Sequence, residues 1–211
     1  MTRKALNSLL VLSFLLFCAC DASVNRSKYL GDGEHSNGMN SVNGSIRVGD
    51  GCTVNGGCRT VNGRIEVGKG SLVEELDTVN GRIVIGADVT VDGDATTVNG
   101  SVRCGPGSKV SGKVTTVNGD IELDRVQVQG DVVTVNGDVR LSSGSTVRGA
   151  IVIKGKRGVF SGRHRLEIRV EGGSTVEGGI DVRDPDNEVE VFISKDSTVK
   201  GEIRNAKVIR E

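Results

Sequence analysis

One 19-residue stretch, residues 134–152, reads TVNGDVRLSSGSTVRGAIV. Its apolar residues include Val135, Val139, Leu141, Val147 and Ile151. The step of two from Val139 to Leu141 is typical of a strand with one buried face. The steps of four cross Asn-Gly and Arg-Gly, where glycine lets the backbone turn, and a third turn is expected at SSGS. Three short strands and three corners predict one triangular coil of a parallel β-solenoid.

The same unit recurs along the chain. Six Val-Asn-Gly triplets begin at residues 42, 61, 79, 98, 117 and 135, in steps of 18 or 19 residues that are typical of a repeat protein. Three further apolar columns keep this spacing: Ile46, Ile65, Ile83, Val102, Ile121 and Val139; Val48, Val67, Ile85, Cys104, Leu123 and Leu141; Val54, Val73, Val91, Val110, Val128 and Val147. A seventh triplet, Val54-Asn55-Gly56, falls in the last of these columns and is therefore predicted to lie at a different corner.

The repeat continues to the C-terminal region with two interruptions. The column of Val147 goes on at Val176 and Val199, each preceded by Ser-Thr, but in steps of 29 and 23 residues. Insertions are therefore expected near residues 154–163 and 184–187. The predicted fold class is all-β: a single-stranded parallel β-solenoid of about eight to nine coils with 18–19 residues each, over residues 41–211.

Polar residues form columns beside the apolar ones. An amide ladder is expected because each asparagine side chain can bond to the next coil, as in stacked β-structures. Its members are Asn43, Asn62, Asn80, Asn99, Asn118 and Asn136. On an outward position Arg47 should face Glu66, and Arg103, Glu122 and Arg140 alternate in charge. These columns predict structural ladders rather than a ligand site.

The N-terminal residues indicate export. Residues 1–19 have a positive start at Arg3 and Lys4 and an apolar segment from Leu9 to Phe17 that is too short to span a bilayer. Ala19 followed by Cys20 resembles a bacterial lipobox, which implies lipidation of Cys20; an ordinary cleaved signal peptide is the alternative. The polar, glycine-rich residues 20–40 are predicted to be a flexible tether.

Conventional catalytic and metal motifs are missing from the sequence. Cys52, Cys58 and Cys104 are expected to be buried free thiols, with a disulfide left to be checked. His164 stands alone among arginines, and no Cys/His spacing suits a metal, so neither a cofactor nor a metal is expected. The acidic segments 92–94 and 184–188 are interpreted as turns rather than calcium loops. Equal numbers of basic and acidic residues, 27 each, argue against a nucleic-acid partner.

The two insertions carry opposite charges. Residues 154–169 hold six basic residues and one acid, and residues 181–190 hold five acids and one arginine. On one interpretation the segments lie on adjacent coils and neutralise each other. On the other, the basic segment meets an anionic envelope component or a partner protein. The candidate binding residues are Lys156, Arg157, Arg163 and Arg165.

The Val-x-Gly-x-Ile rhythm resembles that of the bactofilins, polymer-forming bacterial cytoskeletal proteins, and is similar to that of β-strand-repeat adhesins of bacterial envelopes. The resemblance covers residues 41–153 well and residues 174–203 loosely. It implies a right-handed triangular β-helix, in line with the usual crossover hand. Typical bactofilins are cytosolic and carry no export signal, so the lipobox favours a rod tethered in the envelope.

Two functions from different classes are therefore expected. The first is a non-enzymatic structural or scaffolding lipoprotein, with self-association through unpaired strand edges. The alternative is an adhesin-like module that binds a polysaccharide or a partner protein; a polysaccharide-active enzyme ranks third. Membrane contact is expected through the N-terminal lipid. Asp21 after Cys20 resembles an inner-membrane retention signal, which favours the periplasmic face of the inner membrane, with the outer membrane as the alternative.

Overall fold

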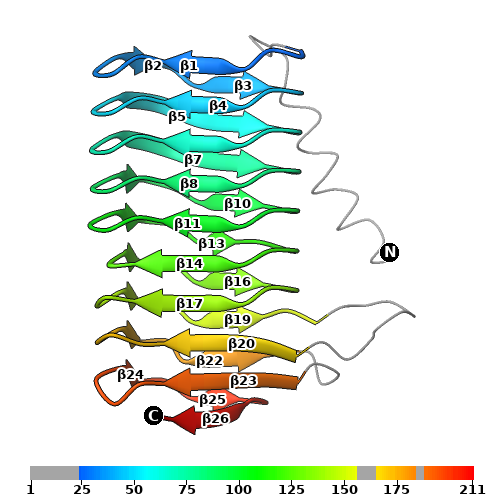
Figure 1. The fold of residues 1–211 in the computed structure, drawn as a ribbon, viewed down its shortest axis with the longest axis vertical. Helices are drawn as coiled ribbons and strands as arrows, with labels where there is room; N and C mark the ends of the chain where they lie inside the picture. The colour runs from blue at the N-terminus through cyan, green and yellow to red at the C-terminus, as the bar shows by residue number, and fades with distance from the viewer. Residues whose placement is uncertain (1–23, 156–164, 184–187) are drawn as a thin grey trace.

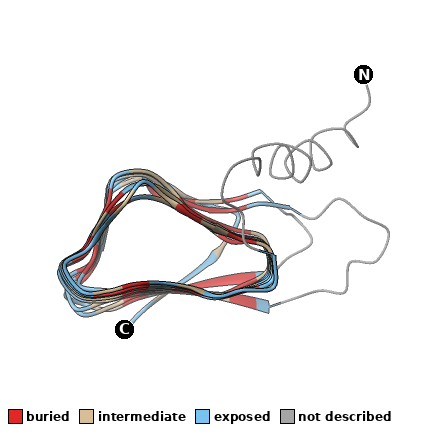
Figure 2. Ribbon diagram, turned by 90° about the horizontal axis from the view of Figure 1, so that it is seen from above, coloured by how far each residue is buried: buried red, intermediate tan, exposed pale blue. Residues whose placement is uncertain are grey.

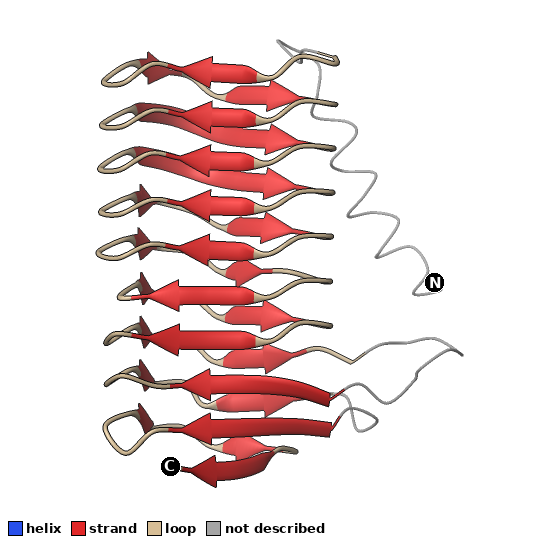
Figure 3. Ribbon diagram, viewed as in Figure 1, coloured by secondary structure: helices blue, strands red, loops and turns tan. Residues whose placement is uncertain are grey.

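A computed structural model describes residues 24–155, 165–183 and 188–211, and it confirms the expected fold class. These residues form parallel strands and no helix. About nine turns stack into the elongated solenoid of Figure 1, which Figure 3 colours by secondary structure. Seen down its axis in Figure 2, the solenoid is a three-sided tube with buried residues on every side.

Each coil contributes strands to three faces. The first face is a 10-stranded sheet, in the order β1 (Lys28–Leu30), β4 (Ile46–Val48), β6 (Ile65–Val67), β8 (Ile83–Ile85), β11 (Val102–Cys104), β14 (Ile121–Asp124), β17 (Val139–Ser142), β20 (Arg165–Val170), β23 (Glu188–Ile193) and β26 (Lys207–Arg210). The other two faces form one 16-stranded sheet, because the long strands β5 (Thr53–Thr60) and β7 (Leu72–Thr78) run from one face to the next.

The remaining strands are short and complete these two faces. The second face contains β2 (His35–Ser36), β9 (Thr90–Val91), β12 (Lys109–Val110), β15 (Gln127–Val128), β18 (Thr146–Val147), β21 (Thr175–Val176) and β24 (Thr198–Val199). The third face contains β3 (Met39–Ser41), β10 (Ala95–Thr97), β13 (Val114–Thr115), β16 (Val132–Thr134), β19 (Ile151–Ile153), β22 (Ile180–Val182) and β25 (Ile203–Arg204).

The core consists of residues stacked in register. Val102 lies opposite Ile121, which lies opposite Val139, and all three are at most 1% exposed. The expected thiols are confirmed, since Cys52, Cys58 and Cys104 are buried and free. Burial raises the pKa of the Cys58 and Cys104 thiols to about 12, which keeps them protonated and unreactive. The core is thus aliphatic and continuous from coil to coil.

One predicted core column is wrong. The valines of the six triplets are only half-buried, and the hydroxyl residues that precede them point inward instead. These inward residues are Ser41, Thr60, Thr78, Thr97, Thr116 and Thr134, all at most 2% exposed. The reason is strand alternation: in β10, Ala95 points inward, Thr96 outward and Thr97 inward, so Val98 already lies in the corner.

The solenoid begins earlier than expected. The predicted tether of residues 20–40 overlaps a first coil, in which β1 pairs with β4 while β2 and β3 pair with β5. Leu30 and Met39 belong to the core at 9% and 5% exposure. This coil lacks the Val-Asn-Gly triplet, and Ser36 occupies the column of Val54. The composition of the coil therefore resembles that of a linker.

The expected insertions lie between β19 and β20 and between β22 and β23. Most of their residues lie outside the described part of the chain, and so does His164. The strands that follow them, β20 and β23, have six residues each and are longer than the other strands of the first face. Within the described ranges, the structure contains no helix with the length and apolar character needed to cross a membrane.

The inward hydroxyl column makes hydrogen bonds between coils. Thr116 Oγ1 donates to the Gly100 carbonyl at 2.9 Å, and Thr60, Thr78 and Thr97 bond in the same way to the preceding coil. Thr134 differs, because its buried hydroxyl oxygen has no hydrogen-bond partner in the structure of the described residues. The last threonine of the column therefore carries the cost of a buried polar group without the compensating bond.

This difference predicts opposite outcomes for two isosteric substitutions. Thr116→Val should lower the free energy of unfolding by about 1 kcal/mol, because it removes a buried hydrogen bond and leaves the Gly100 carbonyl without it. Thr134→Val should leave the free energy unchanged or raise it, because it removes an unpaired hydroxyl. Urea unfolding followed by circular dichroism checks both. Equal losses in the two variants would contradict the assignment.

Candidate functional site

The asparagine column is a continuous ladder of side-chain amides. In each rung the Nδ2 of one asparagine donates to the Oδ1 of the asparagine in the preceding coil, over 2.7–2.8 Å. The ladder also includes Asn25, which accepts from Asn43 at 2.7 Å and was not predicted. It ends at Asn136, whose Oδ1 is buried without a partner because Gly155, without a side chain, takes the asparagine position in the next coil.

The glycine after each ladder asparagine is required by the closeness of the coils. A Cβ atom on Gly100 would lie 2.0 Å from the Gly81 carbonyl oxygen, and one on Gly137 would lie 1.9 Å from that of Gly119. Real side chains cannot occupy such positions without moving the backbone. The Asn-Gly pair therefore combines a rung with the space that lets neighbouring corners stack, and its chemistry is structural.

A buried serine column at the next corner was missed from the sequence. Ser145 Oγ accepts a hydrogen bond from the Val126 N–H at 3.1 Å, and Ser174 and Ser197 repeat this bond in the following coils. The signal was available, because the serines keep the repeat spacing two residues before the valine column. A polar residue at a regular spacing suggests a surface turn, whereas here it satisfies backbone groups inside the corner.

A groove lies on the first face of the solenoid. It has a volume of about 560 Å³ and crosses β8, β11, β14 and β17. It lies where one corner is short: Leu123 to Val128 spans five residues, against six from Cys104 to Val110 in the preceding coil. In Figure 1, the loop after β14 protrudes less far from the solenoid than the loop after β11. The missing residue leaves an indentation between neighbouring corners.

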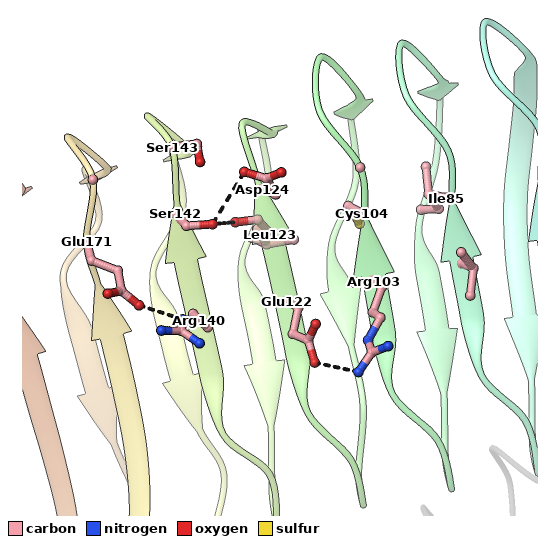
Figure 4. Close-up of a pocket in the computed structure, with 13 residues that line it drawn as sticks. Ile85, Arg103, Cys104, Glu122, Leu123, Asp124, Arg140, Ser142, Ser143 and Glu171 are labelled. Atoms are coloured by element: carbon pink, nitrogen blue, oxygen red, sulfur yellow. Dashed lines mark hydrogen bonds and ion pairs between the residues drawn. The ribbon is translucent and has the colours of Figure 1, made fainter.

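Ion pairs line this groove. Arg103 Nη2 donates to Glu122 at 2.9 Å and Arg140 Nε donates to Glu171 at 2.5 Å, as Figure 4 shows. The expected contacts between Arg47 and Glu66 and between Arg103 and Glu122 are thus present, the former at 2.5 Å. Asp124 and Ser143 add an exposed carboxylate and an exposed hydroxyl at the corner. Donors and acceptors suited to a polar ligand therefore alternate along the solenoid axis.

A smaller concavity of about 250 Å³ continues along the same face over β14, β17 and β20. Its two aspartates are bonded to the backbone of the next coil, because Asp120 accepts from the Asp138 N–H at 3.0 Å and Asp138 from the Glu167 N–H at 2.8 Å. Arg169 lies beside it, with its guanidinium 4.4 Å from the centre of the Phe192 ring. Asp120 and Asp138 thus act as outer rungs between coils.

The described ends of the two insertions meet at Glu190. This carboxylate is 1% exposed although it points outward, because Arg165 and Lys207 cover it. Arg165 Nε donates to it at 3.1 Å and Lys207 Nζ at 2.8 Å. Hydrogen bonds from Lys207 and Arg165 hold the pKa of Glu190 below its usual value. The contact between Arg165 and Glu190 is the kind expected if the basic and acidic segments neutralise each other.

The other predicted site residues remain unplaced. Cys20 and the candidate binding residues Lys156, Arg157 and Arg163 lie outside the described residues. Within residues 24–155, 165–183 and 188–211, no group of three or more His, Cys, Asp and Glu side chains is arranged to hold a metal ion. Of the predicted site residues, the described structure thus places Arg165, on Glu190, and the six asparagines of the ladder.

A second polar cluster lies on the third face. Arg59 Nε donates to Asp77 at 3.1 Å, and Arg59 also pairs with Glu75. Burial, and next the charge of Glu75, raise the pKa of Asp77 from 3.8 to about 6, while Arg59 opposes this shift. The Asp77 side chain is only 16% exposed, so solvent screens this interaction little. The folded protein therefore binds a proton at Asp77 more tightly than the unfolded chain does.

This shift predicts how stability depends on pH. Because the folded-state pKa is raised, ionised Asp77 costs stability, and the cost grows between about pH 4 and pH 6. Asp77→Asn should raise the free energy of unfolding at pH 8 by on the order of 1 kcal/mol, and the gain should shrink as the pH falls to 4. Urea unfolding over this range measures it. A gain that does not vary with pH would contradict the shift.

Known proteins offer no direct guide to the groove or the ladder. Comparison with protein-family models, curated proteins and solved structures finds no match for the chain. The structure is consistent with a β-helix family and supports neither a bactofilin nor a lipoprotein specifically. What the structure establishes is a parallel β-solenoid of about nine turns.

Proposed function

We propose that this protein is a non-enzymatic structural lipoprotein of the bacterial envelope, in which the solenoid acts as a scaffolding rod. The observation that carries the proposal is the uninterrupted stack: six amide rungs run from Asn25 to Asn136 beside a continuous aliphatic core. Such stacking resists bending and local opening, because each coil is held by both neighbours. Self-association through edge strands belongs to the same proposal.

Anchoring rests on the N-terminal sequence. The proposal places a lipid on Cys20. Only a few residues would then separate the membrane anchor from the solenoid, whose first strand starts at Lys28. The first coil is part of the rod, which makes the tether shorter than the sequence suggests. A short tether holds the rod near the membrane, on the periplasmic face of the inner membrane if Asp21 acts as a retention signal.

Cys20→Ser should abolish incorporation of a labelled fatty acid in bacterial cells and move the protein from the membrane fraction to the soluble fraction. The reason is that serine lacks the thiol to which the lipid is attached. Cys52→Ser is the matched control, because that cysteine is buried inside the solenoid and should leave labelling unchanged. Labelling that persists in Cys20→Ser would refute the anchoring.

The groove on the first face supports a second candidate, an adhesin-like module that binds a polysaccharide or a partner protein. Its alternating guanidinium and carboxylate groups offer paired donors and acceptors over several coils. The basic segment Lys156, Arg157, Arg163 and Arg165 would add attraction for an anionic chain. In this candidate Arg165 would contact the ligand and would also cover the Glu190 carboxylate.

A triple substitution of Lys156, Arg157 and Arg163 to serine tests the basic segment without exposing Glu190. Binding to immobilised heparin, used as an anionic polysaccharide probe, should weaken by on the order of tenfold, since each exposed ion pair is worth up to about 1 kcal/mol. Lys109, Arg148 and Lys195 changed together to serine are the control for charge alone, because they lie on other parts of the solenoid. Equal weakening in both variants would refute a specific role for the segment.

A further inference from the structure

The dipeptide Asn-Gly occurs eight times in this chain, and it is chemically fragile. The backbone nitrogen of the glycine can attack the asparagine Cγ, which forms a cyclic imide and releases the side-chain nitrogen as ammonia. Water then opens the imide to aspartate or isoaspartate, so that one water is consumed for each ammonia lost. Six copies are in the ladder, at Asn43, Asn62, Asn80, Asn99, Asn118 and Asn136, and two are outside it, at Asn37 and Asn55.

The ladder holds its asparagines against this reaction. Asn118 donates through Nδ2 to Asn99 at 2.8 Å and accepts through Oδ1 from Asn136 at 2.8 Å. The attacking group is also engaged, because the Gly119 N–H donates to the Asn136 carbonyl at 3.0 Å. Both the amide and the nucleophile must leave their hydrogen bonds before the ring can close. Attack at Asn118 therefore requires local opening of the stack.

Asn55 lacks the side-chain rungs of this protection. It lies in β5 at the point where the pairing with β7 slips, between Val54 and Gly57. Asn55 is exposed, and in the described part of the chain its side-chain amide makes no hydrogen bond. Asn37, in the coil before it, is likewise exposed and makes no rung to Asn55 among the residues described. The side-chain amide of this dipeptide is thus unbonded at the second-face corner and hydrogen-bonded in the ladder.

We propose that Asn55-Gly56 is a site of spontaneous deamidation in the folded protein, and that the ladder protects its six Asn-Gly pairs from the same reaction. Deamidation in the ladder would replace an Nδ2 donor by a carboxylate oxygen, which would face the Oδ1 of the preceding rung. At Asn55 no rung is lost. The slip in β5 already accommodates an irregular residue there, so the product keeps the solenoid and gains a negative charge.

Trypsin separates almost every copy, which allows one experiment to compare them. Asn55 lies in peptide 48–59, and single ladder copies lie in peptides 60–64, 70–82, 83–103, 114–125 and 126–140. The full chain is incubated at mildly alkaline pH, in buffer and in urea that unfolds it, and deamidation is measured by mass spectrometry. In urea all copies should react at similar rates. In buffer Asn55 should keep nearly its urea rate, while Asn118 should slow by on the order of tenfold or more.

Two results would overturn the proposal: equal rates at Asn55 and Asn118 in buffer, or an Asn55 that reacts in urea and not in buffer. A variant tests the protection directly. Asn99→Ala removes the acceptor for Asn118 and the donor to Asn80, so these two neighbours should deamidate faster in buffer while Asn55 is unchanged. Circular dichroism verifies that the variant is folded. Unchanged rates at Asn80 and Asn118 in the folded variant would show that the rungs do not protect.

Discussion

Vertical stacking is the constraint on which the rest of this structure depends. Every coil repeats the path of the coil before it, so a residue meets the same position of its neighbours at the spacing of adjacent strands, about 4.8 Å. Val102, Ile121 and Val139 illustrate it, because each buries the next. No coil can bury its own apolar face alone, and stability is therefore a sum of contacts between neighbours.

The surfaces that could meet a partner arise where this repetition is disturbed. A corner one residue short after β14 indents the first face and forms the groove lined by Arg103, Glu122 and Arg140. The strands that follow the insertions, β20 and β23, are long, and Arg165 and Lys207 cover the buried carboxylate of Glu190 on β23. Regular coils supply stiffness, whereas irregular coils supply the distinctive chemistry of the outer face.

In the Asn-Gly pairs of the ladder, the stacking of the coils both fixes the residue types and protects them chemically. Glycine is needed because a Cβ atom would collide with the carbonyl of the coil before it, and asparagine supplies the rung. Together they form the dipeptide most open to attack by its own backbone. The hydrogen bonds that stack the coils also restrain the reacting groups. The same bonds therefore stabilise the rod and slow deamidation of its asparagines. Asn55, in a slipped strand, shows the dipeptide without that restraint.

The sequence by itself determined the period, the strand columns, the asparagine rungs and the place of the insertions. It could do so because parallel coils in register turn sequence spacing directly into spatial neighbours, as Asn99 and Asn118 show. Only the tertiary structure decided that the first coil starts at Lys28, that threonines rather than triplet valines point inward, and that Glu190 is covered from two sides. These features depend on the path of the backbone through each corner and on contacts across irregular spacings, such as the 25 residues between Arg165 and Glu190, which no fixed period encodes.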